Sequence, residues 1–178
     1  MLEDTFQFET YIVLDVPSPV AEAVMAVREK HRDVFRASLP TEITIAGSSG
    51  VGVLSRGQSP KEVYRLLDQI AAKTAPIEAA FGTVLRFPGT DIFVLTLANE
   101  TPFQRLHNQV AASGILFKES PFPYKPHCTL RSRSPVSDHE VTQLLEFTLP
   151  GTFLLQTMSV YRMRRLPMDL LHRTTLSG

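Results

Sequence analysis

The same order of strand and helix patterns occurs twice along this chain of 178 residues. In each copy a β-branched, apolar run precedes an amphipathic helix pattern, and a second short strand pattern follows. The first copy occupies residues 10–16, 18–33 and 41–47, and the second occupies residues 92–98, 101–114 and 126–130. The separation between Leu14 and Glu42 is close to that between Leu95 and His127. This order predicts a pseudo-repeat of a strand-helix-strand unit.

Further elements separate and follow the two copies. Proline and glycine at 88–91 predict the turn of a hairpin, and Ser18 before Pro19 predicts the N-cap of the first helix. The additional elements are a loop at 48–59, a helix at 60–75, a hairpin at 77–98, a short helix at 137–147, and two final strands at 153–163 and 169–176.

These elements predict an α+β protein with a bilobal fold. Two pseudo-repeated, antiparallel-rich sheets are expected to flank a central cleft, with the helices outside. Residues 1–178 are expected to form a single domain of two pseudo-symmetric lobes, since a chain of this length can bury one core. Within the pseudo-repeat Glu42 corresponds to His127, and Thr44 corresponds to Thr129. The matched residues are expected to line the cleft.

A histidine stands at the start of the last strand of the repeat, directly after the proline-rich segment 120–126. Side chains alternate between the two faces of a strand, so His127 and Thr129 share one face and Cys128 points to the other. An imidazole with a pKa near ~6.5 can hold or release a proton at neutral pH. Cys128 is expected to be a small buried apolar residue rather than a nucleophile.

Composition excludes several classes of protein. Eighteen Lys and Arg balance eighteen Asp and Glu, which argues against a strongly basic nucleic-acid binder. A single cysteine excludes an intramolecular disulfide and any zinc site built from several thiolates. The opening residues 1–10 carry two acids before Glu9 and no apolar signal segment, and no apolar run approaches the length of a membrane span. We expect a soluble, cytoplasmic protein with no membrane partner.

Most of the chain resembles the 2H phosphoesterase superfamily, which includes the RNA 2',3'-cyclic phosphodiesterases also called 2'-5' RNA ligases. The segments that carry the resemblance are LPTEITIAG at 39–47, PYKPHCTL at 123–130, the opening strand and helix at 11–31, and the closing strand from 153. The family pattern consists of two His-x-(Thr/Ser) motifs on facing strands. His127 and Thr129 match one motif fully, whereas Glu42 stands at the histidine position of the other and Thr44 is kept.

The resemblance implies a division of roles. In the family one histidine takes a proton from the attacking water or hydroxyl, the other protonates the leaving oxygen, and the hydroxyls bind the phosphate without a metal or another cofactor. His127 and Glu42 then occupy the catalytic positions. Thr44 and Thr129 occupy the positions of phosphate ligands. The expected substrate is a small phosphoester, such as a nucleoside 2',3'-cyclic phosphate or an RNA end.

Glu42 changes what this site can do. A carboxylate with a pKa near ~4.3 is a much weaker base than an imidazole. Its charge would also repel a phosphate by roughly 4 kcal/mol at ~4 Å and an effective dielectric constant of ~20, unless Glu42 is protonated or paired. Three alternatives follow: a phosphodiesterase with reduced turnover, a non-catalytic relative that binds a nucleotide, phosphate or protein partner, and an enzyme that uses Glu42 as the base on a less anionic substrate.

Other residues are candidates for contacts with the substrate. Tyr124 and Arg131 flank the intact motif, and the glycine-rich loop at 47–52 follows the first strand of the cleft as a mobile phosphate contact. Further arginines that can neutralise the cleft are Arg56, Arg133, Arg162, Arg164 and Arg165. The other histidines, which are His31, His107, His139 and His172, are expected to be structural.

Overall fold

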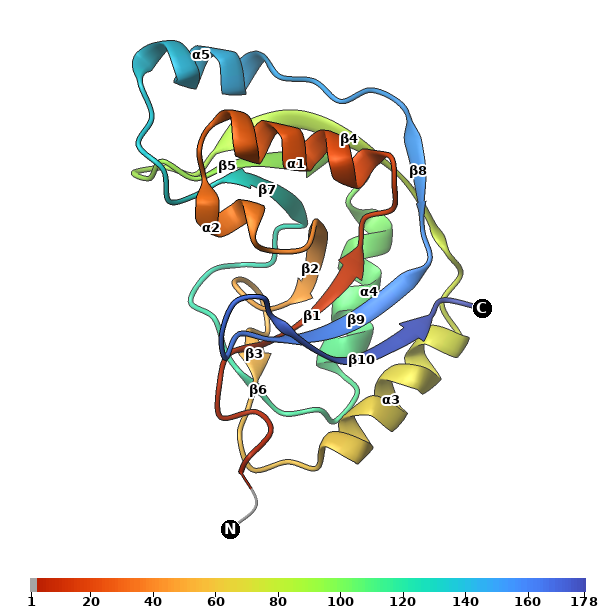
Figure 1. Ribbon diagram of the computed structural model, residues 1–178. Coiled ribbons are helices and arrows are strands. Elements are labelled where there is room, and N and C mark those ends of the chain that lie inside the picture. Colours follow the sequence, from red (N-terminus) through yellow and green to blue (C-terminus); the bar gives the residue numbers. More distant parts are fainter. Residues whose placement is uncertain (1–2) are drawn as a thin grey trace.

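The structure is a computed structural model that describes residues 3–178, and two four-stranded antiparallel sheets form its centre (Figure 1). The first sheet has the order β10-β9-β1-β2, with β1 at Thr10–Asp15, β2 at Glu42–Ala46, β9 at Thr157–Arg162 and β10 at Asp169–Thr175. The second sheet has the order β7-β5-β4-β8, with β4 at Ile77–Arg86, β5 at Phe93–Leu97, β7 at His127–Arg131 and β8 at Thr152–Leu155. A two-stranded ladder joins β3 (Val53–Leu54) to β6 (Phe117–Lys118).

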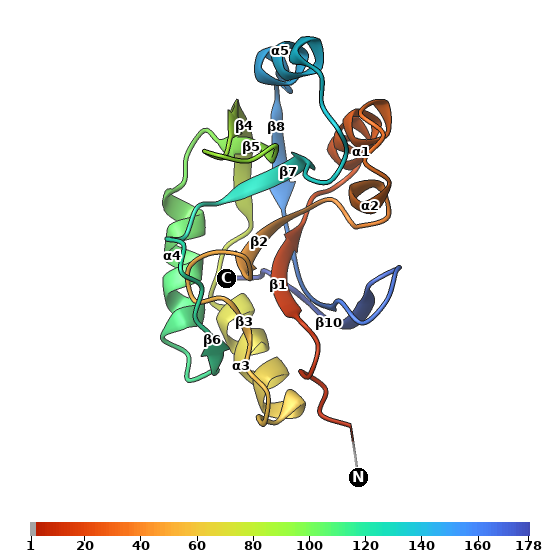
Figure 2. The same ribbon diagram turned by 90° about the vertical axis from the view of Figure 1, so that its left-hand side faces the viewer.

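The helix of each half of the repeat contacts a strand in the sheet of the other half. They are α1 at Val20–Lys30, α2 at Val34–Ala37, α3 at Pro60–Ala72, α4 at Thr101–Ala111 and α5 at Asp138–Glu146. Helix α1 follows a strand of the first sheet but contacts β7 of the second, and α4 follows a strand of the second sheet but contacts β2 of the first. Figure 2 shows α1 and α4 on opposite sides of the strands. The two halves are therefore interlocked through β2 and β7.

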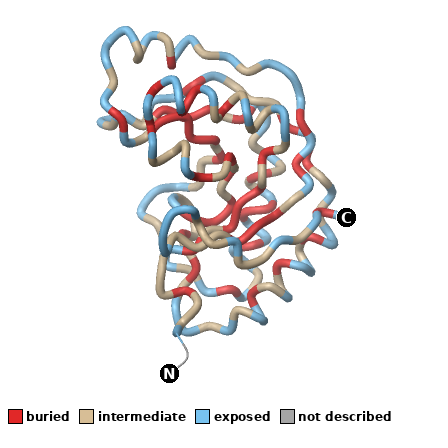
Figure 3. Tube along the Cα trace, viewed as in Figure 1, coloured by how far each residue is buried: buried red, intermediate tan, exposed pale blue. Residues whose placement is uncertain are grey.

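Alternating apolar side chains build the core between the sheets and helices. Ile12 and Leu14 of β1, and Ile43 and Ile45 of β2, have no exposed surface. Burying one such side chain contributes about 1.5–3 kcal/mol to folding. Figure 3 shows this buried interior along the central strands, with exposed residues on the outer faces of the helices. Residues 42 and 44 lie on the other face of β2, which leaves them available to a cavity.

The predicted fold class is confirmed, and three local predictions are wrong. The loop predicted at 48–59 contains strand β3, because Val53 and Leu54 pair with β6. Pro19, not Ser18, is the N-cap residue of α1, and the Ser18 hydroxyl instead donates a hydrogen bond to the Glu22 side chain. The single strand predicted at 153–163 is divided into β8 and β9, because the chain passes from the second sheet to the first at Gln156. That residues 1–178 form one domain stays a prediction.

Candidate functional site

A cavity of about 280 Å³ lies where β2 and β7 contact each other. Its polar lining includes Arg36, Glu42, Thr44, His127 and Thr129. Its aromatic and apolar lining includes Tyr11, Phe35, Tyr161, Met163 and Met168. The two matched motifs of the pseudo-repeat are thus brought to one cavity.

Two polar side chains of β2 are hydrogen-bonded to each other. Glu42 and Thr44 are two residues apart and therefore share a face of the strand. The Thr44 hydroxyl donates a hydrogen bond of 2.9 Å to Oε2 of Glu42. Burial raises the pKa of the Glu42 carboxyl, although the Thr44 hydrogen bond and the charges of Arg36 and Arg28 act in the opposite direction. This carboxyl consequently holds a proton more readily than an exposed glutamate.

One ring nitrogen of His127 is held by a hydrogen bond, and the other has no hydrogen-bond partner among residues 3–178. Its Nδ1 lies 2.6 Å from the Lys125 carbonyl oxygen, which can only accept a hydrogen bond, so we assign the ring proton to Nδ1. The Phe87 ring meets the imidazole edge-on at 5.2 Å between centroids. Burial lowers the pKa of His127, and the Arg36 and Lys125 charges act in the same direction, against the Lys125 carbonyl bond. The neutral ring therefore offers Nε2 as a proton acceptor at neutral pH.

Arg28 forms hydrogen bonds both to β7 and to the segment that precedes β2. This role was not predicted from the sequence. The side chain is buried, with the residue 1% exposed. Its Nε and Nη2 donate hydrogen bonds of 3.1 and 2.8 Å to the Thr129 carbonyl oxygen. Nη1 donates to the carbonyl oxygens of Arg36 and Leu39, which precede β2. The signal in the sequence is an arginine four residues after Val24, on the apolar stripe of the helix.

The short helix α2 brings a second arginine to the cavity, also without a sequence prediction. Asp33 caps this helix by accepting from the Arg36 backbone N–H at 3.0 Å. The same carboxylate accepts from the backbone N–H groups of Ser132 and Arg133, at 2.6 and 3.0 Å, and so joins α2 to the end of β7. Arg36 Nε donates to the Ser132 hydroxyl at 2.9 Å. In the sequence, Asp33 could have indicated this helical turn, because aspartate is favoured at the N-cap position.

Arg133 is the one arginine of the predicted set that lines the cavity among the described residues. Its guanidinium lies 3.5 Å from the centroid of the Phe35 ring, which also lines the cavity. Arg56 and Arg164 form ion pairs with Asp4 and Glu3. Positive charge therefore reaches the site through α2 and the end of β7.

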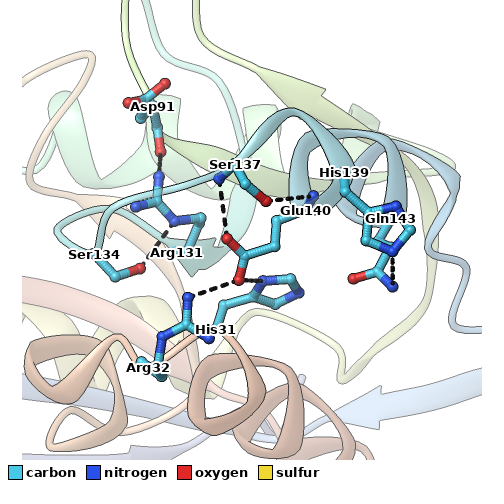
Figure 4. A network of polar contacts seen from close by, with 9 residues as sticks. All are labelled: His31, Arg32, Asp91, Arg131, Ser134, Ser137, His139, Glu140 and Gln143. Carbon is cyan, nitrogen blue, oxygen red and sulfur yellow. Dashed lines mark hydrogen bonds and ion pairs between the residues drawn. The ribbon is translucent and has the colours of Figure 1, made fainter.

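Arg131 does not line the cavity, and we correct its predicted role as a substrate contact. It is fully buried, with Nη1 donating to the Asp91 carbonyl oxygen and Nε donating to the Ser134 hydroxyl at 3.1 Å (Figure 4). Simple alternation would place it beside Thr129, but the β5–β7 register shifts between Phe93 and Val94. This irregularity changes the face on which the next side chain lies. Arg131 therefore supports the end of β7.

Tyr124 and the loop at 47–52 pack beside the site. The Tyr124 hydroxyl donates to the Thr44 carbonyl oxygen at 3.0 Å, and its ring stacks on His107 at 4.1 Å between centroids. Tyr124 is outside the cavity lining, whereas Ser48 of the loop is part of it. The loop is held in place because the Ser120 hydroxyl donates to the Ser48 carbonyl oxygen. A Cβ at Gly52 would lie 1.8 Å from the Lys118 carbonyl oxygen, which explains the glycine.

The described part of the chain holds neither a cluster of metal ligands nor a membrane-spanning helix. In residues 3–178 no three His, Cys, Asp or Glu side chains are grouped so that they could share a metal ion. None of the helices in the same range is long and apolar enough to cross a bilayer.

The sequence pattern of the 2'-5' RNA ligase superfamily matches residues 16–166. The chain belongs to this superfamily. The resemblance to 2H phosphoesterases is thereby confirmed. Comparison with the curated proteins finds no match.

Solved structures share the fold of this superfamily member. E. coli LigT complexed with 3'-AMP has 18% identity and a TM-score of 0.62, over 96% of this chain and 99% of LigT. TT0787 of Thermus thermophilus has 18% identity and a TM-score of 0.61, over 96% of this chain and 98% of TT0787. Kluyveromyces marxianus Usb1 has 10% identity and a TM-score of 0.50, over 91% of this chain and 97% of Usb1. At these identities the likeness establishes the fold alone.

Proposed function

We propose that this member of the 2'-5' RNA ligase superfamily binds and cleaves a small phosphoester, such as a nucleoside 2',3'-cyclic phosphate or the cyclic phosphate of an RNA end. The observation that carries the proposal is the meeting of His127, Thr129, Glu42 and Thr44 at one cavity. Arg36 and Arg133 supply positive charge at the same cavity. A phosphodiester needs such a combination of cationic and hydroxyl donors around its oxygens.

Each motif residue has a separate role in the proposal. The free Nε2 of His127 accepts a proton from the attacking water, because Nδ1 is committed to the Lys125 carbonyl oxygen. The hydroxyls of Thr129 and Thr44 donate hydrogen bonds to the phosphate oxygens. Arg36 neutralises the charge that develops on these oxygens. Glu42 occupies the second catalytic position.

The size of the cavity and the ligands of similar structures support a nucleotide-class substrate. A volume of about 280 Å³ is just below the ~300–1,000 Å³ range of small-molecule sites. It suits a phosphate with its sugar. E. coli LigT has been crystallised with 3'-AMP, ATP, NADP+ and phosphate. The aromatic residues Tyr11, Phe35 and Tyr161 give a base surfaces on which to stack.

Hydrolysis of 2',3'-cyclic nucleotides tests the proposal directly. Replacing His127 by alanine removes the base and should lower turnover by about 10²- to 10⁴-fold. The control is His139→Ala. His139 is an exposed histidine on α5, and within residues 3–178 its Nε2 has a hydrogen-bond contact with Gln143 only. Turnover should be unchanged in this control. Full activity in the His127 variant would contradict the role of His127.

The second candidate function is binding of a phosphorylated ligand without cleavage. It is favoured by the hydrogen bond from Thr44 to Glu42, which occupies a hydroxyl that the phosphate would otherwise use. This candidate predicts no turnover but thermal stabilisation by phosphate or nucleotides, with about 2.7 kcal/mol gained when the ligand is at 100 times its Kd. The absence of both turnover and stabilisation would reject both candidates.

A further inference from the structure

We propose that Glu42 works as a neutral carboxylic acid, which takes up its proton when the phosphoester binds and gives it to the leaving oxygen during cleavage. The inference rests on the proposed function, and it assigns the second proton-transfer role to the residue at which this chain departs from the family pattern.

Glu42 and a bound phosphate would compete for the hydroxyl proton of Thr44. A threonine hydroxyl carries one proton to donate, and in the structure Thr44 donates it to Oε2 of Glu42. A phosphate oxygen bound at Thr44 needs the same proton. An ionised Glu42 can only accept hydrogen bonds, so it would lose its donor and face the phosphate charge at once. A protonated Glu42 has a donor of its own to offer to the ligand.

The surroundings of Glu42 do not hold it as a paired anion. Within residues 3–178, Thr44 provides the only hydrogen bond to the carboxyl group, and no lysine or arginine nitrogen lies within ion-pair distance of it. The charged or titratable groups that face it are Tyr11 and Asp15 of β1, Arg28 of α1, Arg36 of α2, Cys128 and His127 of β7, and Tyr124 of the preceding loop. Glu9 and Arg133 line the same cavity.

These neighbours leave little compensation for a carboxylate. Arg28 directs its donors at backbone carbonyl oxygens, and Arg36 Nε is bonded to Ser132. Asp15, which pairs with Glu42 across the β1–β2 ladder, adds a negative charge. The raised pKa of Glu42 agrees with this geometry, and its main cause is burial. A bound phosphate adds another negative charge and raises the pKa further.

The complementary states of Glu42 and His127 allow a balanced reaction. Water attacks the phosphorus atom while Nε2 of His127 takes one of its protons, and a new P–O bond forms. The bond from phosphorus to one ribose oxygen breaks, and that oxygen receives the proton of Glu42. The products are a phosphomonoester, an imidazolium ion and a carboxylate. Both side chains then return to their starting states by exchanging one proton each with solvent.

Proton uptake on binding tests the inference. The background is His127→Ala, in which cleavage of the ligand is slowed by about 10²- to 10⁴-fold and position 127 cannot titrate. Uridine 2',3'-cyclic phosphate is a suitable probe because its phosphodiester keeps one negative charge across the mildly acidic and neutral range. Calorimetric titration in buffers of different ionisation enthalpy should show uptake approaching one proton per ligand. The affinity should rise by up to tenfold for each unit by which pH is lowered.

Matched variants identify the group that takes the proton. In the same background Glu42→Gln should abolish both the uptake and the pH dependence of affinity, while Glu146→Gln, which changes an exposed carboxylate on α5, should alter neither. Uptake that persists in Glu42→Gln overturns the inference, as does uptake lost instead in Glu9→Gln, the other glutamate of the cavity lining.

Two further results separate this inference from the proposed function. If the probe binds without proton uptake, the inference is wrong and the proposed function stands. If the probe does not bind at any pH, both are wrong. With His127 intact, Glu42→Gln should lower kcat by about 10²- to 10⁴-fold and also lower KM at neutral pH, since it removes the repelling charge. An unchanged kcat would overturn the role of Glu42 as the acid.

Discussion

Arg28 shows how a single side chain can position two strands that are far apart in the sequence. Its guanidinium bonds Thr129 of β7 on one side and the carbonyl oxygens that precede β2 on the other. A guanidinium suits this task because its donors form a rigid, planar fork, whereas an ammonium is a compact point charge. We therefore regard Arg28 as a positioning residue of the site.

Replacing Arg28 by lysine should destabilise the fold and the site together. Lysine keeps the charge but cannot bond both segments at once, so buried carbonyl oxygens lose their donors. We expect the free energy of unfolding to fall by about 3 kcal/mol, as measured by urea denaturation. The control, Arg105→Lys on the exposed side of α4, should change it by less than about 0.5 kcal/mol. Equal effects in the two variants would contradict the bridging role of Arg28.

At the scale of elements, α5 is attached to the rest of the molecule at its first turn. Ser137 and Glu140 form a capping box, in which each side chain bonds the backbone N–H of the other residue. Glu140 also accepts from Arg32 Nη2 at 2.9 Å, and its Oε1 lies 3.5 Å from Nδ1 of His31 (Figure 4). The backbone N–H of Ser137 is the main cause that lowers the pKa of Glu140 to about 2. The cap thus links α5 to the end of α1.

Removing the cap should weaken this attachment. Ser137→Ala deletes the hydroxyl that accepts the Glu140 N–H, and we expect a loss of about 1 kcal/mol in the free energy of unfolding. For a chain of this size the melting temperature should fall by about 2–4 °C. Thr148→Ala, at an exposed position after the same helix, serves as the control. A melting temperature unchanged from wild type in Ser137→Ala would show that the cap does not hold α5.

At the scale of the whole molecule, three histidines make the fold sensitive to acid. Burial lowers the pKa of His31, His107 and His127 below the usual value. His107 Nε2 accepts a hydrogen bond of 3.2 Å from the Val51 N–H, and a protonated ring cannot accept it. The unfolded chain therefore binds protons at these histidines before the folded chain does.

The sign of this linkage gives a pH window. The stability contributed by the neutral histidines is fully present above about pH 6.5 and is lost as pH falls toward their folded pKa values. Each histidine should lower the free energy of unfolding by up to about 1.4 kcal/mol per pH unit in that window. Urea denaturation at several pH values measures the slope, and His107→Gln should reduce it while keeping an acceptor for Val51. A slope that is unchanged in this variant would exclude His107 as a source of the effect.

Local patterns in the sequence were sufficient to predict most elements and the pairing of the two motifs. Apolar periodicity identified β1, α1, β2, α3 and α4, because a strand or helix that buries one face must repeat with the period of its backbone. The pseudo-repeat also matched Glu42 to His127. Both residues line the same cavity, which agrees with this match. The elements depend on residues that are near in the chain, and the correspondence of Glu42 and His127 came from the order of elements in the two halves.

Tertiary structure alone decided the features that depend on contacts between distant segments. The register shift in the β5–β7 ladder turned Arg131 away from the cavity, and the cap at Asp33 brought Arg36 into it. The exchange of helices between sheets placed Arg28 between both motifs. Sequence periodicity carries no information on such register and crossing relations, since they are set by how two whole sheets fit together. The state of Glu42, a half-buried carboxyl that accepts a hydrogen bond from Thr44, followed only from that fit.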